Sequence, residues 1–231
     1  MAREVWLLSL AWIMTAMLGG CSSTLPSEPS TGSKNLFVNG SFEQGTTPWF
    51  ALHGKQWDGF SISDRYAKEG KHSAYLALRA SQETEGSKVF GLIQEVSPKN
   101  FPQRISGYYR IEGWKRGTAK QYLQFVVIVQ GDFTETRFNN YQIRYVLTGV
   151  NQPPLKIANA HYIFLGKAEP QQGAWVRFER DLRADFKQEW GRVPGEFGNL
   201  RILFEARYDG KKANEGEISA DAYYDDLYLG E

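Results

Sequence analysis

The stretch Tyr122-Leu-Gln-Phe-Val-Val-Ile-Val129 decides the fold of this 231-residue chain. Leucine, phenylalanine and valine occupy every second position and alternate with Tyr122 and Gln124. This period of two is that of a β-strand with one face in a core. Toward Val129 both faces become apolar. A strand that is buried on both sides lies in the middle of a sheet, so this segment is predicted to be a central strand.

Other short runs alternate in the same way between turn residues. Ile105–Glu112 and Leu200–Tyr208 each place apolar or small side chains at every second position, and Val176, Phe178 and Leu182 supply a further inward set. About ten short strands predict an all-β domain built from two packed antiparallel sheets, with one short helical turn between residues 182 and 198. The remaining expected strands are Leu36–Phe42, Gly59–Ser63, Ser73–Leu78, Val89–Val96, Gln142–Leu147, His161–Leu165 and Tyr223–Leu229.

Composition narrows the class of partner. The chain carries 27 Lys and Arg against 26 Asp and Glu, a formal charge of +1, which gives no electrostatic reason to bind nucleic acid. Aromatic residues make up 14% of the chain and 23 residues are glycine, which favours β-structure with many turns. Residues 131–173 contain the pair Asn139-Asn140, the pair Pro153-Pro154 and Pro170, and we expect a hairpin with long loops there.

The amino end has the pattern of an export signal. Val5–Leu18 is uncharged and is too short to span a bilayer comfortably, whereas its length and the small residues after it suit a secretory signal. Leu18-Gly19-Gly20-Cys21 follows and holds the only cysteine, which excludes an intrachain disulfide framework. We therefore divide the chain into a signal (1–20), a polar tether that begins at Cys21 (21–34) and one folded domain (35–231).

Leu18-Gly19-Gly20-Cys21 resembles the lipobox of bacterial lipoproteins. The resemblance implies cleavage before Cys21, a lipid on its thiol and acylation of the new amino group, for example with palmitate. It also implies attachment to a membrane of the bacterial cell envelope, and Ser22 is compatible with the outer membrane. The alternative is an ordinary signal peptide that is cleaved nearby and leaves Cys21 discarded or free.

Several motifs recur in an order that resembles the galactose-binding-like β-jelly-roll superfamily. The pieces are Asn39-Gly40-Ser41-Phe42-Glu43 followed by Trp49, then Gly70-Lys71-His72-Ser73, and finally Tyr224-Asp225-Asp226-Leu227. The nearest relatives are carbohydrate-binding modules of the kind attached to xylanases and glucanases. The resemblance covers nearly all of residues 35–231 and implies a jelly-roll sandwich with a sugar-binding surface.

The same resemblance implies a structural calcium ion between the first and last strands. Glu43 and Asp225 would supply side-chain oxygens and a carbonyl near Lys71 another, since calcium takes oxygen ligands. Alternation places Asp225 on the core side with Leu227 and Leu229, where a carboxylate needs a partner. The alternative is that these carboxylates pair with Lys or Arg or accept hydrogen bonds from backbone amides.

Catalytic constellations are absent from the sequence. His53, His72 and His161 have no metal-binding spacing, and no Gly-x-Ser-x-Gly elbow or phosphate-binding glycine loop occurs. The lone cysteine is the residue expected to carry the lipid anchor, which excludes a cysteine nucleophile if that expectation holds. Acidic pairs such as Glu95 with Glu205 would need a separation of roughly 5–10 Å for glycoside hydrolysis. We therefore expect a non-catalytic protein.

Sugar recognition commonly combines an aromatic face with planar polar groups that bond hydroxyls. If the strands concerned are neighbours, their outward side chains would form one polar, aromatic-lined groove. The alternative is that these residues are ordinary edge aromatics and surface ion pairs. The candidate groove residues are Tyr108, Arg110, Tyr122, Gln124, Glu205 and Arg207, and Trp57, Trp114 and Trp190 are candidates for a rim site.

Two functions from different classes follow. The leading hypothesis is a lipid-anchored domain that binds a polysaccharide or another envelope glycan. The alternative is a structural or assembly lipoprotein that holds an envelope protein partner, with residues 131–173 as the docking surface. An open groove that contains Tyr108, Tyr122 and Arg207 would favour sugar, whereas a groove filled by residues 131–173 would favour the protein partner.

Overall fold

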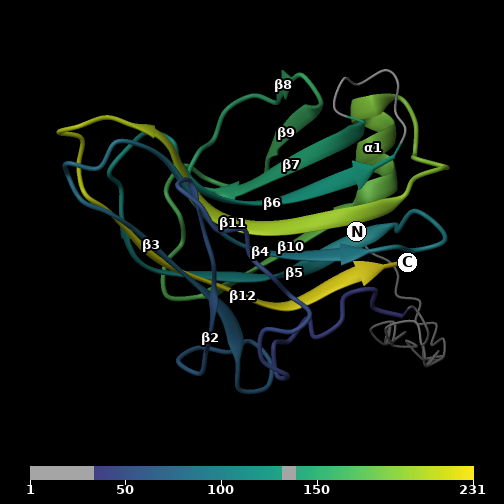
Figure 1. Cartoon of the computed structure of the whole chain (residues 1–231), viewed down its shortest axis with the longest axis horizontal. Coiled ribbons are helices and arrows are strands. Elements are labelled where there is room, and N and C mark those ends of the chain that lie inside the picture. The colour runs from purple at the N-terminus through teal and green to yellow at the C-terminus, as the bar shows by residue number, and fades with distance from the viewer. Residues whose placement is uncertain (1–33, 132–138) are drawn as a thin grey trace, which may run out of the picture. The chain divides into compact units, whose positions relative to one another are not determined.

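A computed structural model describes residues 34–131 and 139–231, and the predicted signal, Cys21 and almost all of the tether lie outside them. Two sheets pack face to face (Figure 1): a seven-stranded sheet in the order β1-β4-β11-β6-β7-β9-β8 and a five-stranded sheet in the order β10-β5-β12-β3-β2. The elements are β1 Trp57–Asp58, β2 Ser61–Ser63, β3 Ser73–Ala80, β4 Gly86–Val96, β5 Arg104–Lys115, β6 Gln121–Gln130, β7 Asn140–Thr148, β8 Leu155–Ile157, β9 Ala160–Phe164, β10 Trp175–Asp181, α1 Leu182–Trp190, β11 Asn199–Lys211 and β12 Ile218–Gly230.

The central position expected for residues 122–129 is confirmed. Strand β6 lies between β11 and β7 and pairs antiparallel with both. The predicted two-sheet sandwich is confirmed as well, and most strand pairs are antiparallel. The exceptions among the described strands are the parallel pairs β1 with β4 and β7 with β9.

The core lies between the two sheets and is rich in aromatic rings. Phe125 stacks on Tyr145, with ring centroids 4.5 Å apart, and on Phe178 of the opposite sheet at 5.0 Å. The hydroxyl of Tyr224 on β12 crosses the core and donates to the Glu205 carbonyl on β11 at 2.9 Å. This packing fixes the backbone positions of β6 and β11. The side chains on the outer face of these strands are therefore held at defined positions relative to one another.

One predicted strand is wrong. Residues 36–42 make turns instead, because Asn39 and Phe42 have positive φ angles of 57° and 59° that interrupt an extended chain. Leu36 still donates to the Leu229 carbonyl at 2.7 Å, so the segment keeps the expected position beside the last strand.

The predicted helical turn is a nine-residue helix, α1. The Asp181 side chain caps its first turn by accepting from the Ala184 amide, and Gly191, with φ 76°, ends it. Buried Asp185 accepts from Arg180 and from the Tyr145 hydroxyl, which ties α1 to β10 and β7. No helix in the described ranges is long and apolar enough to cross a membrane.

Lys211 at the end of β11 gives a first prediction. Its side chain is 2% exposed, and its Nζ donates to the carbonyls of Gln82, Lys212 and Glu215 at 3.0, 3.4 and 3.3 Å. Lys211→Met removes three hydrogen bonds from the ammonium. The carbonyls of Gln82 and Lys212 keep the amides of Asn214 and Glu215 as donors, and we expect the free energy of unfolding to fall by about 2 kcal/mol. Urea denaturation measures this loss. The matched control Lys212→Met removes an exposed ammonium and should change little; equal losses in the two variants would contradict the prediction.

Candidate functional site

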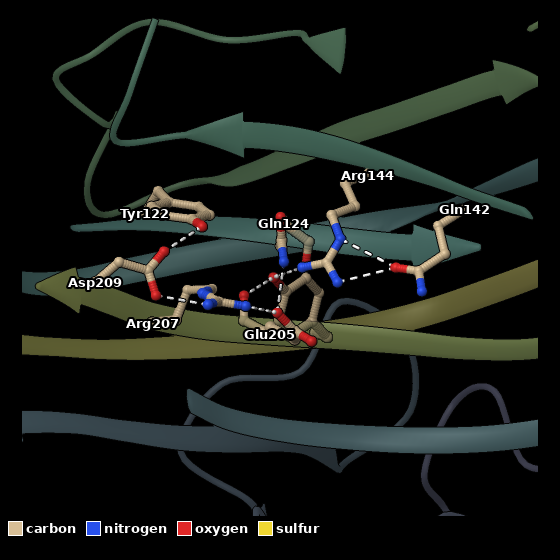
Figure 2. A network of polar contacts seen from close by, with 8 residues as sticks. Tyr122, Gln124, Gln142, Arg144, Glu205, Arg207 and Asp209 are labelled. Carbon is tan, nitrogen blue, oxygen red and sulfur yellow. Dashed lines mark hydrogen bonds and ion pairs between the residues drawn. The ribbon is translucent and has the colours of Figure 1, made fainter. Parts of the chain in front are cut away.

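The outer face of the seven-stranded sheet carries a polar network, which we define as Tyr122, Gln124, Glu205, Arg207 and Asp209 (Figure 2). Tyr122 stands opposite Arg207 and Gln124 opposite Glu205 on the neighbouring strands β6 and β11. The residues between them along each strand point into the core, so alternation places the network outside. Four of the six side chains predicted for a sugar groove therefore lie together.

Hydrogen bonds connect the network from end to end. Glu205 Oε2 accepts from Gln124 Nε2 at 2.6 Å and from Arg207 Nη1 at 3.1 Å. Asp209 Oδ1 accepts from Arg207 Nη2 at 2.5 Å, and Asp209 Oδ2 accepts from the Tyr122 hydroxyl at 2.6 Å. Arg207 thus bridges two carboxylates and holds both in one orientation.

Burial makes these interactions strong. Glu205 is 1% exposed and Gln124 is fully buried. Burial raises the pKa of Tyr122 well above its usual range. Burial alone would lower the pKa of Arg207, but Glu205, Tyr122 and Asp209 more than offset this and raise it. Gln124 Oε1 and Arg207 Nε are buried without a hydrogen-bond partner, so the network retains unused bonding capacity.

A cavity of about 390 Å³ opens beside the network on the same face. Tyr122 of β6 and Tyr162 and Phe164 of β9 give it an aromatic lining, and Asp209 gives it a carboxylate. We call it the outer-face pocket. The remaining lining residues are Lys120, Val146, Val150, Gln152, Leu155 and Ile157, most of which belong to the segment 131–173.

Trp57, a candidate for a rim site, lies on this face as well but does not line the outer-face pocket. It packs against a small apolar cluster of Ile93, Val126 and Leu203, which project outward from β4, β6 and β11. The outer face therefore combines an aromatic pocket, a polar network and an apolar patch.

Tyr108 and Arg110 lie elsewhere, so the expectation of one groove with all six residues is wrong. Both belong to β5, which is a strand of the five-stranded sheet. Arg110 donates to Glu112 at 2.8 Å and lies over the Tyr66 ring at 4.0 Å, while Lys68 lies over Tyr108. The sequence shows that a strand is amphipathic, but long-range pairing decides which sheet it joins.

The other two predicted tryptophans make contacts of their own outside the pocket lining. Trp190 ends α1 and stacks on His161 with ring centroids 3.7 Å apart. His161 Nδ1 lies 3.2 Å from Glu189, and burial lowers the pKa of this histidine. Trp114 lies at the end of β5, and its buried Nε1 has no hydrogen-bond partner. Neither residue lines the outer-face pocket.

Of the three residues predicted to surround calcium, Glu43 contacts Lys71, whereas Asp225 contacts Lys68 and Glu69 of the same loop. Glu43 Oε1 accepts from the amides of Lys71 and His72, both at 2.8 Å. Gly70, with φ 68°, makes room for this, because a side chain there would begin 2.4 Å from Glu43 Oε1. Asp225 Oδ2 accepts from the amides of Lys68 and Glu69 at 2.6 and 3.2 Å.

The face assigned to Asp225 is wrong. A register shift between residues 225 and 228, with Asp226 at φ 50°, inserts an extra residue into β12. Asp225 therefore lies on the outer side with Tyr223, while Leu227 keeps its place in the core. Burial raises the pKa of Asp225 to about 6, against the lowering effect of three backbone amides.

These carboxylates adopt the amide-bonded alternative raised from the sequence. Glu43 Oε2 faces His72 Nδ1 at 3.2 Å and Asp225 Oδ1 accepts from the Asp226 amide, so the side-chain oxygens are already in use. The described residues contain no cluster of three or more potential metal-ligating side chains, and as arranged they do not fit calcium.

Calcium stays a prediction. A melting curve with and without chelator tests it: a lower melting temperature in chelator supports an ion, and no change argues against one.

Glu95 and Glu205 do not form a pair suited to glycoside hydrolysis. Glu95 stands opposite Arg201 and bonds to it at 2.7 Å. Arg201 and Glu205 are four residues apart on β11, roughly 13 Å along the strand. This separation exceeds the roughly 5–10 Å that hydrolysis requires.

Of the residues that line the outer-face pocket, only Tyr122 was predicted from the sequence, and Asp209, Tyr162 and Phe164 are among those missed. Asp209 continues the outward alternation of Glu205 and Arg207 by one more step, so the period of two contained its signal. Tyr162 and Phe164 alternate within the predicted strand 161–165, but nothing local shows that β9 joins β7 in the sheet.

No protein-family model and no curated protein matches the chain. Among solved structures, the module TmCBM61 in complex with β-1,4-galactotriose is 17% identical, covers 85% of this chain and 98% of its own, and has a TM-score of 0.45. The CBM22-1 xylan-binding domain from Paenibacillus barcinonensis Xyn10C is 18% identical, covers 87% and 97%, and has a TM-score of 0.41. A likeness of this degree leaves the assignment of function to the residues of this chain.

Proposed function

We propose that this protein is a non-catalytic, lipid-anchored protein of the bacterial cell envelope that binds oligo- or polysaccharide in the outer-face pocket. The observation that carries the binding proposal is the aromatic pocket beside a buried, pre-oriented polar network. Tyr122 contributes to both, since it lines the pocket and donates to Asp209.

The chemistry of the pocket suits a sugar. Tyr162 and Phe164 offer aromatic surface to the apolar side of a pyranose ring. Asp209, Gln152 and Lys120 offer acceptors and donors for hydroxyl groups. Sites of a few hundred cubic ångströms that combine an apolar lining with a few oriented polar groups are typical of small-ligand recognition.

A binding role is favoured over a catalytic one by how the carboxylates are used. Glu205 accepts from Gln124 and Arg207, and Asp209 accepts from Arg207 and Tyr122. A general acid or nucleophile must reach the substrate, whereas Glu205 is 1% exposed. The hydrogen bonds of the Glu205 and Asp209 carboxylates fix the orientation of the neighbouring side chains. A fixed arrangement of polar groups suits the recognition of a ligand.

A glycan array tests the binding proposal. The probe is the soluble chain from residue 21 with Cys21→Ser, checked for folding by its melting transition. Saturable binding to at least one glycan supports the proposal. A folded sample that binds none of a panel of plant, fungal and bacterial glycans overturns it, and release of reducing sugar from a bound glycan overturns the non-catalytic part.

Lipid attachment gives a second prediction. Expressed in a bacterium, the full chain is expected to incorporate labelled palmitate and to sediment with membranes. Cys21→Ser removes the thiol that accepts the lipid, so both the label and the membrane fraction should fall to background. Ser22→Cys in the Cys21→Ser chain is the matched control, since it restores a thiol one residue away. Unchanged sedimentation of Cys21→Ser would contradict the lipid anchor.

A second function is favoured by one specific feature, the short edge strand β8. Leu155 and Ile157 are 39% and 53% exposed on this strand beside the pocket. An exposed apolar edge strand is a place where a partner chain adds a strand. An envelope protein that is co-purified with the full chain and lost on Ile157→Lys would support this function over sugar binding.

A further inference from the structure

Arg144 of β7 is a cation on the outer face whose charge has no acidic partner among residues 34–131 and 139–231. Its Nε and Nη2 donate to the neutral amide oxygen of Gln142, at 3.2 and 2.9 Å. A guanidinium has five N–H groups, so donors remain for a ligand. The side chain is partly exposed, and Figure 2 shows it beside Gln124 and Glu205.

Arg144 also lies at the edge of the outer-face pocket. It stands opposite Tyr162 on the neighbouring strand, and its guanidinium lies over the Tyr162 ring at 5.4 Å from the centroid. Tyr162 itself lines the pocket. A sugar ring that contacts Tyr162 would therefore bring its substituents within reach of Arg144.

Lys120 is a second cation at the pocket. It lines the cavity, its side chain is exposed, and in the described part of the chain no carboxylate pairs with it. By contrast, the two acids nearby are already paired, since Glu205 and Asp209 both accept from Arg207. The charges left for a ligand are positive.

We propose that the pocket binds acidic saccharides, in which a uronic acid carboxylate pairs with Arg144 and a second carboxylate on the chain can approach Lys120. This inference rests on the proposed sugar-binding function and names its substrate class. A guanidinium recognises a carboxylate through two parallel hydrogen bonds, and an aromatic ring beneath it holds its plane. A neutral sugar would leave the free donors of Arg144 to water.

The test compares each acidic glycan with its own carboxyl-reduced form. The probes are polygalacturonate, alginate and a glucuronic-acid-bearing xylan, each before and after reduction, titrated against the soluble Cys21→Ser chain. We expect at least one acidic probe to bind about tenfold more tightly than its reduced form, the effect of one hydrogen-bonded charge pair. Arg144→Gln should remove this preference, so that the acidic probe binds no more tightly than its reduced form.

The matched control is Arg177→Gln, which removes an equal charge from β10 of the other sheet, where Arg177 is exposed. It should keep the preference. A reduced form that binds as tightly as its acidic parent, or a preference that survives in Arg144→Gln, overturns this inference and leaves the proposed function standing. A folded chain that binds neither the acidic nor the reduced probes, nor any glycan on the array, overturns the proposed function itself.

Discussion

Arg207→Met is expected to lower the free energy of unfolding by about 3–5 kcal/mol. Arg207 is the one cation among residues 34–131 and 139–231 that bridges Glu205 and Asp209, and only 14% of its side chain is exposed. Without it, Glu205 stays buried with a single donor, Gln124, and an uncompensated buried carboxylate is costly. Chemical denaturation measures the change.

The matched control for this loss is Arg201→Met. Arg201 lies on the same strand and bonds to Glu95, but both side chains are more than a third exposed. Exposed pairs contribute about 0–1 kcal/mol, so this variant should stay close to the parent. Equal losses in the two variants would contradict the role assigned to burial.

A double variant separates charge from packing. The double variant combines Glu205→Gln with Arg207→Met. It removes the unpaired Glu205 carboxylate and keeps a side chain of the same shape beside Gln124. It is expected to recover a large part of the stability lost in Arg207→Met. A double variant as unstable as the single one would show that Arg207 acts through packing alone.

Tyr162→Ala is expected to weaken glycan binding by about 30-fold, the effect of removing an aromatic anchor from a binding site. Tyr162 is partly buried on β9, lines the pocket and supports Arg144. Because β9 lies near the edge of its sheet, between β7 and β8, the core between the sheets does not depend on this ring. The melting temperature of the variant checks that the loss of binding is local.

The sequence predicted those parts of the fold that depend on local pattern. Alternation along residues 122–129 and 200–208 identified two strands and the faces they turn inward, and both are confirmed. The pattern failed at residues 36–42 and at Asp225. There, positive φ angles and an inserted residue change the direction of the chain without an obvious mark in the composition.

The candidate site was predictable in part for the same reason. Tyr122, Gln124, Glu205 and Arg207 belong to strands whose alternation is strong, and the two strands are neighbours. Tyr108 and Arg110 show equally good alternation, but β5 pairs with β10 and β12 in the other sheet. Choice of sheet depends on contacts far apart in sequence, such as the stacking of Phe125 on Phe178.

The most direct test of the outer-face pocket compares two tyrosines. Tyr162 lines the pocket, whereas Tyr108 lies on the opposite sheet and was an equal candidate from the sequence. The measurement is the dissociation constant of the best glycan from the array for Tyr162→Ala and for Tyr108→Ala. The proposed site predicts about a 30-fold loss for Tyr162→Ala and less than about a twofold loss for Tyr108→Ala. Full binding by Tyr162→Ala, or a loss confined to Tyr108→Ala, would contradict it.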